Sequence, residues 1–420
     1  MTRLVSGAST AMFRIGFGLV GLILTVRFFA HGWIDPLFIA PEFHFKYPGF
    51  AWVEPLPGIG MYLVFGALAL CSVSIALGLW HRVGAAGFAV GLAYVELIER
   101  TNFLNHYYWM ILTAVVMAFL PMSRTWSLDV WRGRADDTGG RVPMWVVWLL
   151  RFQVGMVYFF AGVAKINPDW LVRAEPLSTW LPARAELWLV GPLLALPATP
   201  FALAWAGALF DVTVVGWLLI QRTRLVAYAA LVAFHLSTWL LFPSIGVFPL
   251  VMGLGALVFF EPDWPRALSR RVVLAQGGGG RLRPLWVGVA TVYVLAMLLI
   301  PVRHLAIPGD VRWTGEGYQG AWQVMLTDKT GTVDFLVTKD GSTWIVPPPA
   351  YLTDRQMAVM ATDPALIAQT ARLIAAEHGG SVSARALVAV NGRRSVRFTD
   401  ESVDIGQGPP ATAQWVTAAP

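Results

Sequence analysis

The residue of this sequence best suited to chemistry is a lysine that ends an apolar run. Lys165 closes the segment YFFAGVAK and is followed by Asn167-Pro168, which should end a helix soon after it. Burial favours the neutral form of an amine, so a lysine in this position could serve as a general base. The position equally suits a lysine whose charged end reaches the membrane interface.

Further polar side chains lie in or beside apolar segments: Asn105, His106, Arg151, Gln153, Asp211, His235, Arg303 and His304. Ionisable groups are costly inside a membrane, so each is a candidate for a functional site. His235 equally suits a hydrogen bond between helices, and His106 and His304 suit anchoring at the interface. Asp211 could pair with an arginine or belong to a proton path. Arg151 suits a carboxylate partner better than a substrate.

The composition indicates the setting in which these groups act. Of the 420 residues, 56% are hydrophobic and 13% are charged, whereas soluble domains carry about 25% charged residues. This excludes a soluble enzyme, a disordered chain and a fibrous protein. The single cysteine, Cys71, excludes an internal disulfide and a CxxC site. The net charge of +6 comes mostly from arginines between apolar runs, which indicates membrane orientation rather than nucleic-acid binding.

Residues 1–302 predict an all-α polytopic transmembrane helix bundle. A helix needs about 17–25 apolar residues to cross a bilayer. Nine segments approach this length: 11–30, 59–80, 83–98, 106–122, 144–164, 202–220, 225–241, 245–260 and 286–302. Arg14 and Arg27 in the first segment predict a span rather than a cleavable signal peptide. The weaker patch 187–196 is interrupted by proline and predicts an interfacial or re-entrant piece.

The basic residues between these segments predict the orientation, because nine crossings place alternate loops on opposite sides. One set of loops holds thirteen arginines: Arg3, Arg82, Arg124, Arg132, Arg134, Arg141, Arg222, Arg224, Arg266, Arg270, Arg271, Arg281 and Arg283. The other set holds five basic residues: Lys46, Arg100, Lys165, Arg173 and Arg184. Basic loops face the cytoplasm. We therefore expect a multi-pass integral membrane protein with a cytoplasmic N-terminus and an extracytoplasmic C-terminal domain.

Residues 303–405 predict that extracytoplasmic domain, a small α+β fold. Two hairpins are expected: 333–346, turning at Asp340-Gly341, and 386–399, turning at Asn391-Gly392. Between them, 353–377 predicts one amphipathic helix with Thr353 as its N-cap. Residues 406–420 predict a disordered tail. The run Gly277–Gly280 predicts a flexible linker before the last apolar segment.

The motifs of common soluble enzymes are missing. The sequence has no GxGxxG after a strand, no Walker loop, no HExxH and no GxSxG. A haem-linked quinol oxidoreductase is one alternative, since His106 and His235 both lie in apolar segments. The expected topology places these two histidines at different depths, which disfavours a shared haem. A transporter or sensor is a second alternative, but the sequence shows no internal repeat of the kind that transporters carry.

The segment VPMWVVWLLRFQVGMVYFFAGVAKINPDWL, residues 142–171, resembles the vitamin K-dependent gamma-glutamyl carboxylase family. It is similar to the part of that family that carries the catalytic lysine in the pattern YFxAGxxKxxxDW. TNFLNHYYW, residues 101–109, is similar to the family's Asn-His motif. Other segments match in order: WSLD (126–129), FHLSTWLLFPSIGVF (234–248), EPDWPRAL (261–268), LLIPVRHL (298–305), WTGEGYQGAW (313–322) and SVRFTDESVDI (395–405). The similarity covers most of the chain, including the first part of the external domain.

The resemblance implies an enzyme that couples two reactions. Reduced vitamin K, or menaquinol in a bacterial-type member, is oxygenated by O2 to its epoxide, and the base formed on the way removes the γ-proton of a glutamate, which then adds CO2. Lys165 would be the catalytic base with His106 assisting it, and His304 would act on the glutamate. Substrate-binding roles are expected for Asn105, Arg151, Gln153, His235, Trp313 and Tyr318. The expected partners are a glutamate-containing protein or peptide and membrane lipid, without nucleic acid or metal.

The chain departs from the family pattern at two positions. Ala164-Lys165 stands where animal members have a double lysine, and Gly317 precedes Tyr318 where a bulky apolar residue is usual. Animal members also continue beyond the matched region with a part that helps hold the propeptide of their substrate. Quinol epoxidation without carboxylation is therefore an alternative within the same enzymatic hypothesis.

Overall fold

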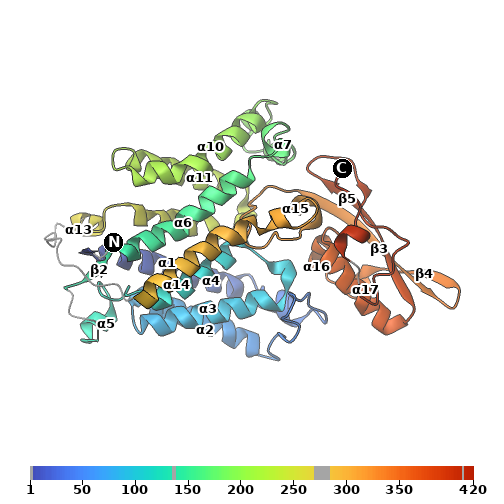
Figure 1. The fold of residues 1–420 in the computed structure, drawn as a ribbon, viewed down its shortest axis with the longest axis horizontal. Helices are drawn as coiled ribbons and strands as arrows, with labels where there is room; N and C mark the ends of the chain where they lie inside the picture. The colour runs from blue at the N-terminus through green and yellow to red at the C-terminus, as the bar shows by residue number, and fades with distance from the viewer. Residues whose placement is uncertain (1–2, 135–138, 269–283, 409–410) are drawn as a thin grey trace.

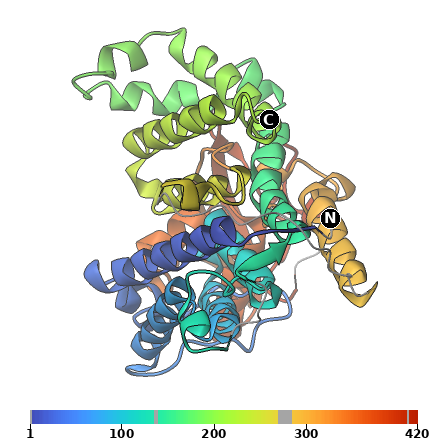
Figure 2. The same cartoon turned by 90° about the vertical axis from the view of Figure 1, so that its left-hand side faces the viewer.

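A computed structural model describes residues 3–134, 139–268, 284–408 and 411–420, and the predicted Gly277–Gly280 linker lies outside them. A helical region and a smaller C-terminal α/β domain lie side by side along the long axis of the molecule (Figure 1). Within the helical region, helices α10 and α11 lie on one side and α2 and α3 on the other (Figures 1 and 2).

All nine predicted apolar segments contain helices. Six are long and apolar enough to cross a membrane: α1 (Ala8–Ala30), α2 (Gly60–Leu77), α6 (Met144–Ala164), α10 (Thr199–Leu219), α11 (Arg224–Leu241) and α14 with its extension η6 (Pro284–Ala306). The other three are α3 (His81–Ile98), α4 (Asn105–Phe119) and α12 with its extension η5 (Phe248–Phe259). The chain is therefore a multi-pass membrane protein, but the prediction of about nine spans is confirmed for six. At about 1.5 Å per residue, α4 is shorter than the roughly 30 Å hydrocarbon core.

The two ends of the bundle are held by different contacts. At one end, β1 (Leu4–Ser6) pairs antiparallel with β2 (Arg141–Pro143), and the Ser9 amide donates to the Pro262 carbonyl over 3.0 Å. At the other end, the Gln356 side chain donates to the Phe43 carbonyl and to the Glu99 carboxylate, each over 2.8 Å. Loops that follow α1 and α3 are thus joined to the C-terminal domain.

Three buried arginines stabilise helix ends at the β1–β2 end. Arg14 donates to the carbonyls that end α2, Arg151 to those that end η5, and Arg224 to those that end α10. The last carbonyls of a helix lack partners within the helix, and a buried end needs others. Arg224, one of the thirteen arginines on which the predicted orientation rests, therefore has a structural role in the fold.

The C-terminal domain is built on a four-stranded antiparallel sheet in the order β4-β3-β5-β6. Its strands are β3 (Lys329–Lys339), β4 (Ser342–Val346), β5 (Ser381–Val390) and β6 (Val396–Arg397). Both predicted hairpins are confirmed. Asp340-Gly341 and Asn391-Gly392 adopt the positive φ angles that tight hairpin turns require.

Two predictions for this domain are corrected. The single helix expected at 353–377 is divided into α16 (Asp354–Met360) and α17 (Pro364–His378), because Asp363-Pro364 starts a new helix with Asp363 as N-cap. Thr353 does cap α16. The expected disorder of the tail is wrong for residues 411–420, since Trp415 is 3% exposed and Val416 bridges to Thr399.

The remaining connections are short helical turns. They are α5 (Leu128–Trp131), α7 (Pro168–Leu171), α8 (Leu177–Trp180), α9 (Gly191–Leu194), α13 (Trp264–Leu268) and α15 (Val311–Thr314). The weaker apolar patch at 187–196 contains only α9.

Candidate functional site

Lys165 forms a buried ion pair with Asp211. Lys165 follows the last residue of α6, and Asp211 lies in the middle of α10. The Lys165 Nζ is 2.8 Å from the Asp211 Oδ2 and 3.3 Å from the Ala161 carbonyl oxygen. The two side chains are 7% and 6% exposed, and the Trp170 ring faces the Nζ at 5.2 Å. Away from water, the attraction between such charges is much stronger than at a surface.

Gly162 allows this pair to form. A Cβ at Gly162 would lie 2.6 Å from the Val212 amide nitrogen, too close for any side chain. The backbones of α6 and α10 therefore touch one helical turn before Lys165 and beside Asp211. Small residues permit such close approach between membrane helices.

The pair lies in the wall of a cavity of about 620 Å³. Most of the lining is aliphatic or aromatic, and the volume falls in the range of about 300–1,000 Å³ typical of small-molecule sites. Leu193, Leu203 and Leu240 line the cavity and are also exposed on the outside of the bundle. An apolar ring could therefore reach Lys165 from the bilayer.

A second polar pair, Tyr158 and His235, lines the same cavity. The Tyr158 hydroxyl lies 2.6 Å from the His235 Nε2, and both side chains are 3% exposed. The His235 Nδ1 is buried without a hydrogen-bond partner among the described residues. His235 also lines a neighbouring cavity of about 360 Å³, which Arg27 and Gly246 border.

His106 lies close to this second cavity rather than beside Lys165. A Cβ at Gly246 would lie 3.9 Å from the His106 Nε2. The Phe248 ring contacts the rings of both His106 and His235, at 6.1 and 5.6 Å between centroids. Across the described ranges no hydrogen bond joins His106 to Lys165. Assistance of Lys165 by His106 stays a prediction.

Asn105, His304 and Tyr318 meet at the junction between the bundle and the C-terminal domain. The Tyr318 hydroxyl donates to the Gln323 carbonyl over 3.1 Å. Burial raises the pKa of Tyr318, and the neighbouring Asn105 side chain opposes that rise. A Cβ at Gly317, which has a φ of +77°, would lie 2.8 Å from the His304 Cβ. The glycine at this position therefore matches the close approach of His304.

The junction is linked to the Lys165 cavity by a short segment of chain. Gln323, the acceptor for Tyr318, is followed by Val324 and Met325, which both line the cavity. Of the residues predicted for the two half-sites, the structure thus brings Asn105, His304 and Tyr318 into one group. Lys165 and His235 form the other.

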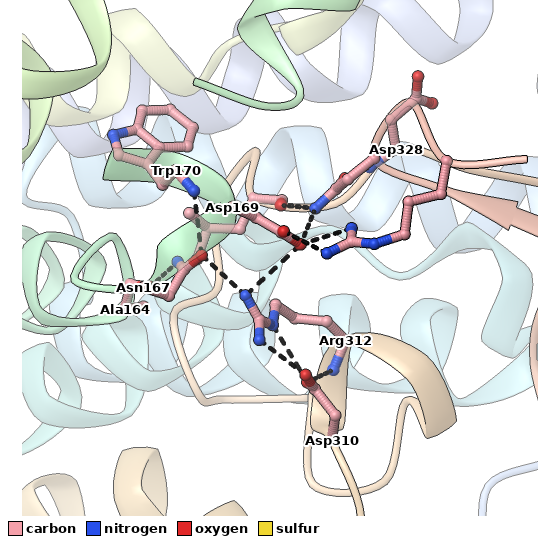
Figure 3. A network of polar contacts seen from close by, with 10 residues as sticks. Ala164, Asn167, Asp169, Trp170, Asp310, Arg312 and Asp328 are labelled. Carbon is pink, nitrogen blue, oxygen red and sulfur yellow. Dashed lines mark hydrogen bonds and ion pairs between the residues drawn. The ribbon is translucent and has the colours of Figure 1, made fainter. Parts of the chain in front are cut away.

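A denser polar cluster begins two residues after Lys165, at Asn167 (Figure 3). The Asp169 carboxylate accepts two hydrogen bonds from Arg393, at 2.5 and 3.0 Å, and one from the Asn391 amide at 3.1 Å. Arg312 donates to the Asn167 side chain over 2.7 Å and to both oxygens of Asp310. We call these residues the Asp169 cluster. They join the end of α6 to the C-terminal domain.

The arginines of the Asp169 cluster keep its carboxyl groups ionised. Burial raises the pKa of Asp169, but hydrogen bonds from Arg393 and Asn391 and the charges of Arg393 and Arg312 outweigh it, so the pKa is lowered. The hydrogen bonds of Arg312 likewise outweigh burial and lower the pKa of Asp310.

Three residues predicted to bind substrate lie elsewhere. Arg151 caps η5, near the opposite end of α6 from Lys165. The Gln153 side chain joins three helices, donating to Thr113 and accepting from Tyr293. Trp313 packs in the core of the C-terminal domain and donates to the Thr417 carbonyl. Substrate binding by these three residues stays a prediction.

Sequence reasoning missed Tyr158 and Gly162 and did not identify Lys165 as the partner of Asp211. Tyr158 stands seven residues before Lys165, a spacing that places both on one face of a helix. That signal was available. For Asp211 an arginine partner and a role in a proton path were both open, and only the packing of α10 on α6 identifies Lys165 as its partner.

Comparison with known protein families gives two matches that follow one another along the chain. The family model described as HTTM domain matches residues 2–264. The model described as vitamin K-dependent gamma-carboxylase, lumenal domain, matches residues 282–419. No solved structure matches the chain. Within the described ranges, no three His, Cys, Asp or Glu side chains are grouped as metal ligands would be.

Proposed function

We propose a function from the premise that this chain belongs to the family that joins an HTTM domain to the lumenal domain of vitamin K-dependent gamma-carboxylases. The proposed activity is oxygenation of a naphthoquinol, such as reduced vitamin K or menaquinol, coupled to γ-carboxylation of glutamate. The observation that carries this proposal is the buried Lys165–Asp211 pair in the wall of an apolar cavity that can accept a fused ring.

Lys165 is the proposed base that takes a proton from the quinol. Its Nζ is held by Asp211 and by the Ala161 carbonyl, so the amine has a fixed position in the cavity wall. Asp211 can hold the proton that a neutral Lys165 must give up. When bound, the quinol supplies, together with O2, the strong base that takes the glutamate γ-proton. The apolar lining excludes water, which would quench that base.

The glutamate half-reaction is assigned to the junction. His304 and Tyr318 would hold the glutamate side chain. Asn105, at the start of α4, lies beside Tyr318. His106, the next residue, lies close to Gly246 and the second cavity. The hydrogen bond from Tyr318 to Gln323, next to the cavity-lining Val324 and Met325, supports coupling between the two half-reactions. CO2 is the second small substrate.

The proposed topology has a cytoplasmic N-terminus and an extracytoplasmic C-terminal domain. The support is the arginine excess at the β1–β2 end and the match of the C-terminal domain to a lumenal one. The proposed partners are a glutamate-containing protein or peptide and the surrounding lipid.

The decisive assay uses the purified protein in lipid nanodiscs with reduced vitamin K or menaquinol, labelled bicarbonate and a glutamate-rich peptide. Wild type should form both epoxide and fixed label, Lys165→Ala neither, and the control Lys339→Ala, on the exposed end of β3, both. General-base catalysis contributes about 10²–10⁴-fold, which sets the expected loss. Epoxide without label would favour an epoxidase. Absence of epoxide with either quinol would contradict the enzymatic proposal.

A further inference from the structure

In the proposed reaction the quinol gives up both of its hydroxyl protons. One hydroquinone and one O2 give one quinone epoxide and one water, so neither ring oxygen keeps its hydroxyl proton. Lys165 accounts for one of these protons. Any second acceptor has to lie in the same cavity, because the ring carries both hydroxyl groups.

We infer that Tyr158 and His235 form this second acceptor and bind the quinol oxygen opposite Lys165. This inference rests on the proposed function. The Tyr158 hydroxyl can receive the quinol proton while passing its own to the His235 Nε2, 2.6 Å away. No bond other than O–H and N–H bonds changes in this step. The imidazole becomes an imidazolium, and the ring oxygen becomes an oxyanion.

The spacing on α6 supports a two-point site. Tyr158 and Lys165 are seven residues apart on one helix face, or about 10 Å along the axis at about 1.5 Å per residue. A ring with an oxygen at each end, plus one hydrogen bond of about 2.8 Å at each oxygen, has a length of this order. The rings of Phe210 and Phe234, stacked with centroids 4.6 Å apart, line the same cavity, and the Phe210 ring contacts the Tyr158 ring at 6.3 Å.

The surroundings of His235 give the proton a way out. Its Nδ1 has no partner among the described residues, and the ring lines both the 620 Å³ cavity and the neighbouring 360 Å³ cavity. A structural tyrosine–histidine pair would need neither feature. The neighbouring cavity extends to Gly246, close to His106.

Binding of quinol and of its two monomethyl ethers under anaerobic conditions tests the inference without turnover. Tryptophan fluorescence would report binding to wild type, Tyr158→Phe, His235→Gln and Lys165→Ala. Tyr158→Phe should weaken quinol binding about three- to tenfold, the effect of one hydrogen bond. One ether should be insensitive to Tyr158→Phe and the other insensitive to Lys165→Ala, because each methyl group blocks one contact. In the active enzyme, Tyr158→Phe and His235→Gln should each slow epoxide formation at least tenfold and change its solvent isotope effect.

Tyr293→Phe is the matched control, since it removes another buried phenol hydroxyl that bonds Gln153 and lies outside this cavity. If Tyr158→Phe binds both ethers and forms epoxide like Tyr293→Phe while Lys165→Ala forms none, the second acceptor is ruled out and the proposed function stands. If wild type forms no epoxide and no variant affects quinol binding, both proposals fail. Ether selectivity in the predicted pattern supports the two-point site even if Tyr158→Phe or His235→Gln is too unstable to purify. Either of these two variants alone shows the selectivity.

Discussion

Lys165 and Asp169 lie only four residues apart in the chain, but the polar clusters to which they belong differ in how fully their groups are bonded. In the cavity, Asp211 has the Lys165 Nζ as its one side-chain partner among the described residues, and the His235 Nδ1 has none. In the Asp169 cluster, the carboxylate accepts three hydrogen bonds and has Arg312 nearby as a further cation. The side chains of Lys165 and Asp169 are nevertheless similarly buried, at 7% and 11% exposed.

The difference separates a structural connection between two parts of the molecule from a candidate reactive site. A buried polar network with every group bonded is rigid and holds its parts in one arrangement. A buried pair with bonding capacity left over beside an apolar cavity can bind a ligand or move a proton. Burial alone does not distinguish the two, so the number of bonds that each group makes is the better guide to function.

The largest expected effect breaks the Lys165–Asp211 pair. Asp211→Leu and Lys165→Met alone should each lower the free energy of unfolding by about 3–5 kcal/mol, because each leaves one charge buried without a partner. The double variant should recover most of this stability, since apolar side chains often replace a buried ion pair at little cost. Thermal unfolding in nanodiscs would measure all three. Additive losses in the double variant would contradict a direct pair.

Asp169→Ala should have the next largest effect. It removes charge-assisted hydrogen bonds worth about 1.5–3 kcal/mol and leaves Arg393 without its carboxylate partner. Hydrogen exchange should rise at the junction, while the Lys165 cavity keeps its quinol affinity. Asp328→Ala is the control, because Asp328 contacts the cluster through its backbone (Figure 3). Equal effects of the two variants would show that the Asp169 carboxylate does not hold the end of α6 to the C-terminal domain.

Gly162→Ala should cost about 1–3 kcal/mol and sharply lower epoxide formation, because its methyl group would push α10 away from α6. Gly216→Ala is the matched control on α10, where a Cβ meets nothing within 4 Å. The control should be neutral or slightly stabilising, as expected for Gly to Ala in a helix. Activity assays and thermal unfolding on the pair of variants would separate close packing from helix propensity. Unchanged activity in Gly162→Ala would show that the helix contact does not position Asp211.

The smallest expected effect is a pH dependence confined to the Asp169 cluster. The folded pKa values of Asp169 and Asp310 are lowered, so both groups add stability above their unfolded pKa of about 3.9. This stability is lost as pH falls through the lower folded values. The midpoint temperature of thermal unfolding should therefore fall as the pH is lowered below about 4, and it should fall less in Asp169→Asn. A variant with the full pH dependence of wild type would assign the effect to other carboxyl groups.

The sequence predicted most of the secondary structure because its signals are local. Apolar runs gave the helices, and Asp340-Gly341 and Asn391-Gly392 gave the hairpins. The division at Asp363-Pro364 was also a local signal and was overlooked. Six of the nine predicted spans are confirmed by length and composition, whereas α4 and the α12–η5 segment are shorter than a membrane crossing usually requires.

The site was predictable only in part, because its geometry depends on contacts between helices. Lys165 was identified by its position and by resemblance. Its pairing with Asp211 depends on the contact of Gly162 with α10, which no spacing within one segment encodes. Arg151 suited a carboxylate partner from its position alone, but its side chain donates to backbone carbonyls at the end of η5, an acceptor that the sequence does not reveal.

The small sheet between β1 and β2 has a consequence for biosynthesis. Leu4 pairs with Pro143, and a ribosome adding about 5–20 residues per second needs roughly 7–30 seconds to travel between them. Throughout that interval the first four helices are available to the bilayer while the N-terminal strand has no partner. Insertion of this half and its closure into a tertiary unit are therefore separate events, and the start of α6 is the step that joins them.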